Sequence, residues 1–208
     1  MKVKVCGITN FEDALLCEAC GADAVGFIFY NKSKRYIKPE TTREIIKSLS
    51  PFTMKVGVFV DENVENINRI ASEIKLNAIQ LSGNESPENS SKIILPVIKG
   101  FRIKEDFDFS IIDRYKNTAY LLDAFSSEEF GGTGKKFTWD LIPAYLKNKI
   151  ILAGGVSVDN IENIFRKIQP AAVDLSSSLE KAPGIKDKEK VVNFFEKFNL
   201  LRLKETSC

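Results

Sequence analysis

Short runs of apolar, mostly β-branched residues alternate along the chain with longer segments in which apolar residues recur every three or four positions. The short runs are typical of strands and the longer segments of amphipathic helices. Eight runs are predicted to be strands: Val3–Cys6, Ala24–Phe29, Lys55–Val60, Ala78–Leu81, Val97–Ile103, Ala119–Asp123, Ile150–Ala153 and Ala172–Leu175.

Several of these runs are apolar almost throughout, which suits strands of a parallel sheet that is covered on both faces. About eight helical segments alternate with them; Asn10 is placed to cap the first and Pro39 to open the second. This alternation predicts an α/β fold with right-handed crossovers. Eight units can close into a (β/α)8 TIM barrel, which we favour, while an open doubly wound sheet is the alternative. No linker divides the chain, so residues 1–208 are predicted to form a single domain.

Composition narrows the classes of partner. The chain has 208 residues, of which 44% are hydrophobic and 28% charged, as in ordinary globular domains. Thirty basic and twenty-eight acidic residues give a net charge of +2, so no nucleic-acid partner is indicated. The apolar runs are too short to span a bilayer and no signal-peptide core follows Met1, so we expect a cytoplasmic protein with reduced cysteines and no membrane partner.

Histidine is absent from the chain. Its absence excludes histidine acid–base chemistry, Ser-His-Asp triads and most zinc sites. Cys17 and Cys20 form a C-x-x-C pair, but they lie in a helical segment with no second pair. They are therefore predicted to be ordinary helix residues.

Two candidate proton-transfer groups end predicted strands, at the edge where barrels of this class carry their sites. Cys6 ends the first strand, and its thiolate can act as base or nucleophile if its pKa falls from about 8.5. Asp123 ends the sixth strand and can act as general acid if its pKa rises by about 3 units. Taken singly, an inert buried thiol and a turn cap are the simpler interpretations of Cys6 and Asp123.

The last two strands are followed by turns that suit an anion. Gly154 and Gly155 let the backbone approach a ligand closely, and Ser176 and Ser177 offer hydroxyl and amide donors. Loops at these places commonly bind phosphate in barrels, so we predict a phosphate site, with two plain tight turns as the alternative. Arg35, in a basic loop after the second strand, can pair with a substrate carboxylate or remain solvated.

The glycine-rich segment Phe130–Phe137 follows the sixth strand. Its Gly134-Lys135 is followed by Lys136 rather than by Ser or Thr, so it does not meet the spacing of a P-loop. We expect either a lid over the site or a flexible connection.

Taken together, these motifs resemble phosphoribosylanthranilate isomerase of tryptophan biosynthesis. The resemblance covers nearly the whole chain in order. It is carried by Lys4–Asn10, Gly21–Phe29, Ser33–Tyr36, Val56–Val60, Gln80–Gly83, Leu121–Asp123, Gly131–Gly134, Leu152–Val156, Val173–Ser177 and Pro183–Asp187. It implies a (β/α)8 barrel that acts on a small phosphosugar by an Amadori rearrangement, without cofactor or metal.

The resemblance also assigns roles to residues. N-(5′-phosphoribosyl)anthranilate would become 1-(2-carboxyphenylamino)-1-deoxyribulose 5-phosphate, with Asp123 as general acid toward the ribose ring oxygen and Cys6 as general base toward C2. Arg35 would bind the anthranilate carboxylate. The phosphate would be bound around Gly154, Gly155, Ser176 and Ser177.

Three positions depart from the family's usual pattern. Ser82 replaces a histidine, Thr138 replaces an aspartate, and Ser178 replaces the glycine of the phosphate turn. The third is expected to weaken phosphate binding, because it puts a Cβ where glycine would allow a positive φ. None of the three touches the proposed acid or base.

Two other functions remain open at this point. A barrel that binds a phosphate ligand without catalysis would keep the phosphate turns. Indole-glycerol-phosphate synthase would need a lysine acid and paired glutamates; Lys55 and Lys99 lie on strands, but no matching carboxylates stand out. Metal-dependent pentulose-phosphate isomerases would need histidine ligands. Either a monomer or a homodimer is compatible with the sequence.

Overall fold

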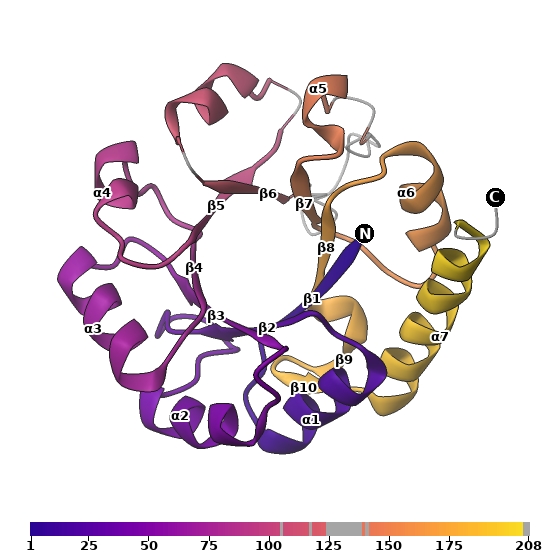
Figure 1. Cartoon of the computed structure of the whole chain (residues 1–208), viewed down its shortest axis with the longest axis horizontal. Coiled ribbons are helices and arrows are strands. Elements are labelled where there is room, and N and C mark those ends of the chain that lie inside the picture. The colour runs from indigo at the N-terminus through magenta and orange to yellow at the C-terminus, as the bar shows by residue number, and fades with distance from the viewer. Residues whose placement is uncertain (105, 117, 124–138, 140–141, 206–208) are drawn as a thin grey trace.

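In the computed structural model, eight parallel strands close into a barrel in the order of the sequence (Figure 1). The structure describes residues 1–104, 106–116, 118–123, 139 and 142–205. Closure confirms the (β/α)8 barrel and rules out the open doubly wound sheet. The strands are β1 (Lys2–Cys6), β2 (Ala24–Ile28), β3 (Met54–Phe59), β4 (Ala78–Leu81), β5 (Val97–Arg102), β6 (Ala119–Asp123), β7 (Ile150–Ala153) and β8 (Ala172–Leu175).

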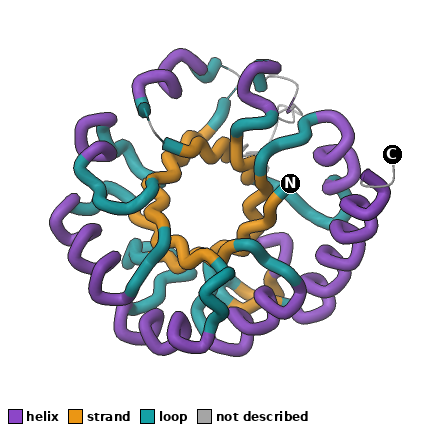
Figure 2. The backbone as a smooth tube through the Cα atoms, in the orientation of Figure 1, coloured by secondary structure: helices purple, strands orange, loops and turns teal. Residues whose placement is uncertain are grey.

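Helices surround the barrel, and loops join them to the strands (Figure 2). Asn10 caps the first helix by accepting a hydrogen bond from the Asp13 N–H, and Pro39 opens the second, as predicted. The helices are α1 (Phe11–Cys20), α2 (Pro39–Ser48), α3 (Val64–Ile74), α4 (Pro87–Ser91), α5 (Ala144–Lys147), α6 (Ile161–Lys167), α7 (Lys188–Glu205) and the 3₁₀ helices η1 (Phe109–Arg114) and η3 (Ser177–Leu179).

Two parts of the fold were not predicted. In the described part of the β5–β6 connection the chain forms the 3₁₀ helix η1 rather than an α-helix, and η1 begins where the Asp108 side chain accepts a hydrogen bond from the Ser110 N–H. After β8 the chain forms a small hairpin of β9 (Glu180–Ala182) and β10 (Ile185–Lys186) before α7 begins. Gly184 allows the tight turn between them because its φ is +82°.

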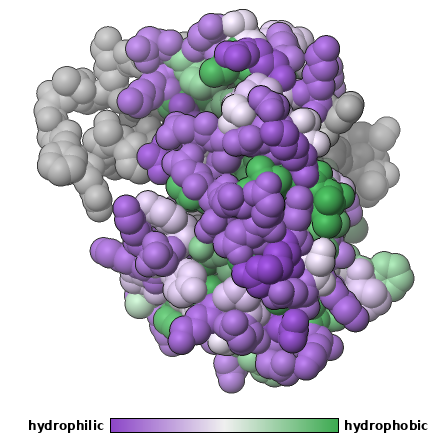
Figure 3. Space-filling model, turned by 90° about the vertical axis from the view of Figure 1, so that its left-hand side faces the viewer, coloured by the Kyte–Doolittle hydropathy of each residue, from purple (hydrophilic) through white to green (hydrophobic). Residues whose placement is uncertain are grey.

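The main apolar core lies between the strands and the helices. Outward-facing strand residues such as Phe27 and Leu122 are buried there, and so are Phe194 and Phe198 of α7. The side of the molecule in Figure 3 is mostly hydrophilic, as expected where helices turn polar faces to solvent. Among the described residues, no helix has the length and apolarity needed to cross a bilayer.

Cys17 and Cys20 both lie in α1, as predicted. Cys17 is fully buried in the core, and burial raises the pKa of its thiol to about 12. Such a thiol stays protonated at neutral pH and packs as a small apolar side chain.

Candidate active site

The proposed base Cys6 ends β1 and faces the inside of the barrel. A Cβ added to Gly26 of β2 would lie 2.9 Å from Cys6 Sγ and 3.1 Å from Lys4 Nζ. Lys4 and Cys6 therefore point to the same interior side, as alternation along a strand requires. Glycine is needed at position 26 because any larger residue would displace these two side chains.

Beneath Cys6 the barrel holds a buried ion pair. Lys4 Nζ of β1 lies 2.9 and 3.0 Å from the two carboxylate oxygens of Asp174 of β8. The two side chains are only 4% and 8% exposed. Burial lowers the pKa of Lys4, but the Asp174 carboxylate and the Cys6 thiol outweigh it, so the net pKa is raised and the ammonium stays charged.

Cys6 is 7% exposed, and burial raises the pKa of its thiol. The ammonium groups of Lys4 and Lys186 act against that rise, whereas Asp174 adds to it. The thiol is thus in an environment where two cations can stabilise its ionised form.

Asp123 ends β6, where its backbone pairs in register with Arg102 of β5. Burial raises the pKa of the Asp123 carboxyl, and the nearby Asp174 carboxylate raises it further. Arg102 acts in the opposite direction but does not cancel the rise. The direction is the one that a general acid requires, because the carboxyl keeps its proton to higher pH.

Arg35 is held by a partner that the sequence analysis missed. Its Nε lies 2.8 and 3.1 Å from the two Glu180 carboxylate oxygens, and its Nη2 lies 2.6 Å from one of them. Burial alone would raise the pKa of Glu180, but the hydrogen bonds from Arg35 and Lys186 lower it. One edge of the guanidinium is therefore occupied, and only its remaining N–H groups are left for a substrate carboxylate.

Lys186 joins several parts of this region. Its side chain is 0% exposed, and its Nζ lies 2.7 Å from Cys6 O, 3.4 Å from Ser176 O and 3.0 Å from Glu180 Oε1. The ends of β1 and β8 are thereby tied to the β9–β10 hairpin, and through Glu180 to Arg35.

The two glycines of the first predicted phosphate turn have a backbone conformation that glycine favours. Gly154 and Gly155 have φ values of +79° and +72°, in the left-handed region that glycine favours. After β8, the hydroxyls of Ser176 and Ser178 are buried with no hydrogen-bond partner among the described residues. Buried polar atoms normally have a partner, so these two hydroxyls mark a place for a polar ligand. Ser177 follows in the same turn, as the first residue of η3.

The expected strain at Ser178 is not found. Among the described residues, the non-glycine positions with positive φ are Asp61, Lys75 and Gln169, so the backbone at Ser178 does not need glycine. The chain instead enters the 3₁₀ helix η3 there. The premise of a positive φ at Ser178 was therefore wrong, while the effect of Ser178 on phosphate binding stays a prediction.

Replacing Ser176 with alanine is expected to raise the KM for substrate and the inhibition constant of inorganic phosphate roughly 10- to 100-fold. A hydrogen bond to a charged group contributes about 1.5–3 kcal/mol. The Tm should not fall, because the hydroxyl has no partner within the described protein. The control is Ser91→Ala, whose hydroxyl bonds to Glu88 O on the exposed helix α4. Unchanged phosphate inhibition in Ser176→Ala would show that the hydroxyl faces no phosphate.

Ser82, one of the three positions noted above as departures, follows β4. The Gln80 side-chain nitrogen donates a hydrogen bond of 3.0 Å to Ser82 Oγ, and Gln80 Oε1 is buried without a partner in the described part of the chain. Outside the barrel, the buried pair of Lys99 Nζ and Glu85 Oε2, 2.8 Å apart, fixes the loop that follows. Glu85 also accepts the Gly83 N–H.

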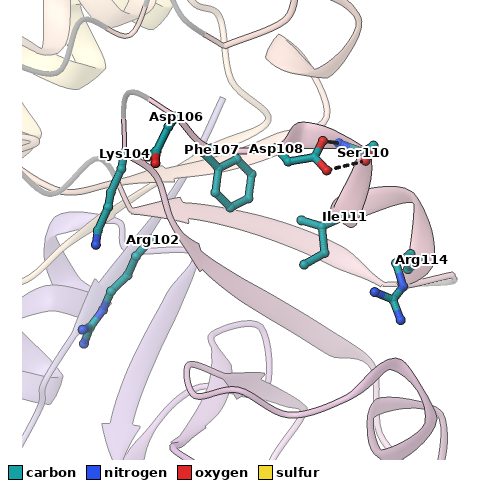
Figure 4. Close-up of a pocket in the computed structure, with 8 residues that line it drawn as sticks. All are labelled: Arg102, Lys104, Asp106, Phe107, Asp108, Ser110, Ile111 and Arg114. Carbon is teal, nitrogen blue, oxygen red and sulfur yellow. Dashed lines mark hydrogen bonds between the residues drawn. The ribbon is translucent and has the colours of Figure 1, made fainter.

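A cavity of about 400 Å³ lies between the end of β5 and η1 (Figure 4). Phe107 and Ile111 form an apolar part of its wall, while Arg102 and Lys104 extend side by side away from that wall. Since Arg102 is the register partner of Asp123, the cavity adjoins the strand end that carries the proposed acid. The Gly131–Gly134 loop and Thr138 lie outside the described residues, so both alternatives for the loop, a lid and a flexible connection, remain predictions.

Comparison with known proteins agrees with this arrangement. A family model described as N-(5'phosphoribosyl)anthranilate (PRA) isomerase matches residues 3–197. The N-(5'-phosphoribosyl)anthranilate isomerase of Geobacter sp. (strain M21) is 45% identical over 194 residues, which cover 93% of this chain and 95% of that protein.

Two crystal structures are also similar. Phosphoribosyl anthranilate isomerase from Thermotoga maritima gives a TM-score of 0.87 at 43% identity and covers 96% of this chain and 98% of its own. A complex of the isomerase with reduced 1-(o-carboxyphenylamino)-1-deoxyribulose 5-phosphate gives 0.85 at 40% identity, with the same coverage of 96% and 98%. This chain therefore belongs to the N-(5'-phosphoribosyl)anthranilate isomerase family.

Proposed function

We propose that this isomerase of tryptophan biosynthesis acts on N-(5′-phosphoribosyl)anthranilate with Asp123 as general acid and Cys6 as general base. Asp123 donates its proton to the ribose ring oxygen while the bond from that oxygen to C1 breaks and the nitrogen lone pair forms a C1=N bond. The Cys6 thiolate then removes the proton on C2, and the C–H electron pair forms a C1=C2 bond as the nitrogen regains its pair. The enolamine tautomerises to the ketone, 1-(2-carboxyphenylamino)-1-deoxyribulose 5-phosphate.

The observation that carries this proposal is the placement of an inward-facing thiol and a carboxyl of raised pKa at the ends of β1 and β6. These strands are three places apart around the ring, so the two groups can approach a bound sugar from different sides. The first two steps each move a proton between the substrate and one of these two groups, and an acid or base of this kind typically contributes 10²- to 10⁴-fold.

The ends of the substrate are assigned to the two anion-binding candidates. The phosphate would bind at Gly154, Gly155, Ser176 and Ser177, where the unpartnered hydroxyl of Ser176 supports the assignment. The carboxylate would bind to the free edge of Arg35, whose position is fixed by Glu180. Fixing both ends of the substrate aligns its C1 and C2 with the acid and the base.

The positions of two lysines disfavour an indole-glycerol-phosphate synthase. Lys55 lies near the amino-terminal end of β3, where its Nζ donates to Ser50 O. Lys99 is engaged by Glu85 and by the carbonyl of Gly83. Neither ammonium group is directed into the barrel mouth, as a lysine acid would need to be.

The deciding experiment is an assay with freshly formed phosphoribosylanthranilate. We expect its anthranilate-type fluorescence to disappear at a rate proportional to enzyme concentration, and chelators to leave that rate unchanged. Binding of a reduced product analogue without any turnover would instead support the non-catalytic phosphate-binding barrel.

Three further predictions belong with this function. We take residues 1–208 as one catalytic domain, place the enzyme in the cytoplasm and keep both monomer and homodimer as oligomeric states. Gel filtration with light scattering decides between the two oligomeric states.

A further inference from the structure

The mechanism proposed above leaves one pair of buried charged groups without a role. Barrel interiors are filled mostly by branched apolar side chains. Here Lys4 and Asp174 occupy the interior with 4% and 8% of their side chains exposed. Two buried charges are costly compared with apolar residues of the same volume, so their position next to the reacting groups needs a reason.

We propose that this ion pair sets the charge states of the acid and the base in opposite directions. The Lys4 ammonium stabilises the Cys6 thiolate, and the Asp174 carboxylate favours the protonated form of Asp123. Lys4 and Asp174 are thus positioning residues that act through Cys6 and Asp123. The inference rests on the roles proposed for those two residues.

The case for Lys4 is geometric. Its Nζ and Cys6 Sγ pack against the same glycine, Gly26. An ammonium has three N–H donors; with Asp174 accepting at its two oxygens, one donor remains for the sulfur. Lys186 differs, because its three donors face the Cys6 carbonyl, the Ser176 carbonyl and Glu180.

Among the described residues, four charged groups face Cys6. They come from β1 (Lys4), β8 (Asp174), β10 (Lys186) and the loop after β2 (Arg35). Lys186 and Arg35 share the Glu180 carboxylate, which offsets their charge. Lys4 is therefore the cation best placed to interact with the thiolate.

The case for Asp174 rests on position and like charge: Asp123 ends β6, Asp174 lies near the end of β8, and a single strand, β7, separates β6 from β8. Asp174 of β8 and Arg102 of β5 are the charged groups that face Asp123 among the described residues. Two neighbouring carboxyl groups resist simultaneous ionisation. Burial raises the pKa of Asp174 as well, but the Lys4 ammonium opposes that rise and bonds to both carboxylate oxygens, so Asp174 carries the negative charge and Asp123 keeps the proton.

The test measures the titration of Cys6 directly, in the full chain without substrate. The rate of alkylation by iodoacetamide is followed against pH, and mass spectrometry of the Cys6 peptide separates it from the other cysteines. Lys4→Met/Asp174→Asn keeps the interior filled without leaving a lone buried charge. In this double variant, the pH at the midpoint of Cys6 alkylation is expected to rise by about one unit or more, since an opposite charge at 4–6 Å shifts a pKa by about 1–3 units.

Asp174→Asn alone is expected to shift the pH midpoint of Cys6 alkylation in the opposite direction. It leaves the Lys4 ammonium beside the sulfur without its counterion, so the alkylation midpoint should fall. The same variant should lower the pH at which kcat/KM declines, because Asp123 loses its proton more readily. The matched control, Lys99→Met/Glu85→Gln, removes a buried lysine–glutamate pair outside the barrel and should leave the Cys6 midpoint unchanged.

An unchanged Cys6 midpoint in both Asp174 variants overturns the inference, and so does an equal shift in the control. If the double variant does not fold, as judged by circular dichroism, Asp174→Asn alone decides by the direction of its shift. The proposed function fails separately, through full turnover by Cys6→Ala and Asp123→Asn, since alkylation requires no catalysis.

Discussion

Replacing Cys6 with alanine, or Asp123 with asparagine, is expected to lower kcat at least a hundredfold. Each variant removes one proton-transfer group from a reaction that needs both, and such groups contribute typically 10²- to 10⁴-fold. The fold should persist, because alanine removes a single sulfur atom and asparagine has the shape of aspartate. The measurements are kcat, from the loss of substrate fluorescence, and the Tm of each variant.

Matched controls test whether the loss of turnover depends on positions 6 and 123 rather than on replacing any cysteine or aspartate. Two variants should keep wild-type turnover: Cys20→Ala, at a half-buried position on α1, and Asp113→Asn, at an exposed position on η1. The double variant at positions 6 and 123 should lose little more than either single variant, because groups that act as a unit are not additive. Wild-type turnover in both single variants would remove the mechanism.

Replacing Lys186 with methionine is expected to destabilise the protein by about 3–5 kcal/mol, because it removes one partner of a buried ion pair. The Cys6 and Ser176 carbonyls lose the ammonium that donates to them. The Glu180 carboxylate loses one of the two cations, Lys186 and Arg35, that balance its charge. At roughly 2–4 °C per kcal/mol for a chain of this size, the Tm should fall by about 10 °C. Thermal and urea unfolding measure the change.

The control for this prediction lies in the same hairpin. Lys181→Met also exchanges a lysine for methionine, but the Lys181 side chain is exposed on β9. Its Tm should stay within about 1 °C of wild type, since surface substitutions usually change stability by less than 0.5 kcal/mol. Equal Tm values for the two variants would mean that the Lys186 contacts contribute nothing measurable.

The strands could be predicted because their signal is local. An apolar run such as Ile150–Ala153 suits a strand covered on both faces, and the structure has β7 at the same bounds. Other limits differ by one residue, as where β2 ends at Ile28 rather than at Phe29. Cys6 and Asp123 could be placed at the mouth for the same reason, since the end of a strand fixes the position of its last residue.

The partners of the site residues could not be predicted. Lys4 and Asp174 are 170 residues apart, and Arg35 and Glu180 are 145 apart. A charged residue inside an apolar strand indicates that it needs a partner of opposite charge, but not which residue is that partner. The β9–β10 hairpin was missed because its strands are three and two residues long, too short for a periodic pattern.

The sequence by itself determined the order of strands and helices, the positions of the candidate acid and base, and the glycines of the predicted phosphate turn. These follow from side-chain periodicity and from backbone conformations that only certain residues adopt. The tertiary structure decided which charges meet: closure of the ring brings β1 beside β8, so that Lys4 reaches Asp174 beneath Cys6. That contact depends on the register and tilt of all eight strands together, which no local stretch of sequence contains.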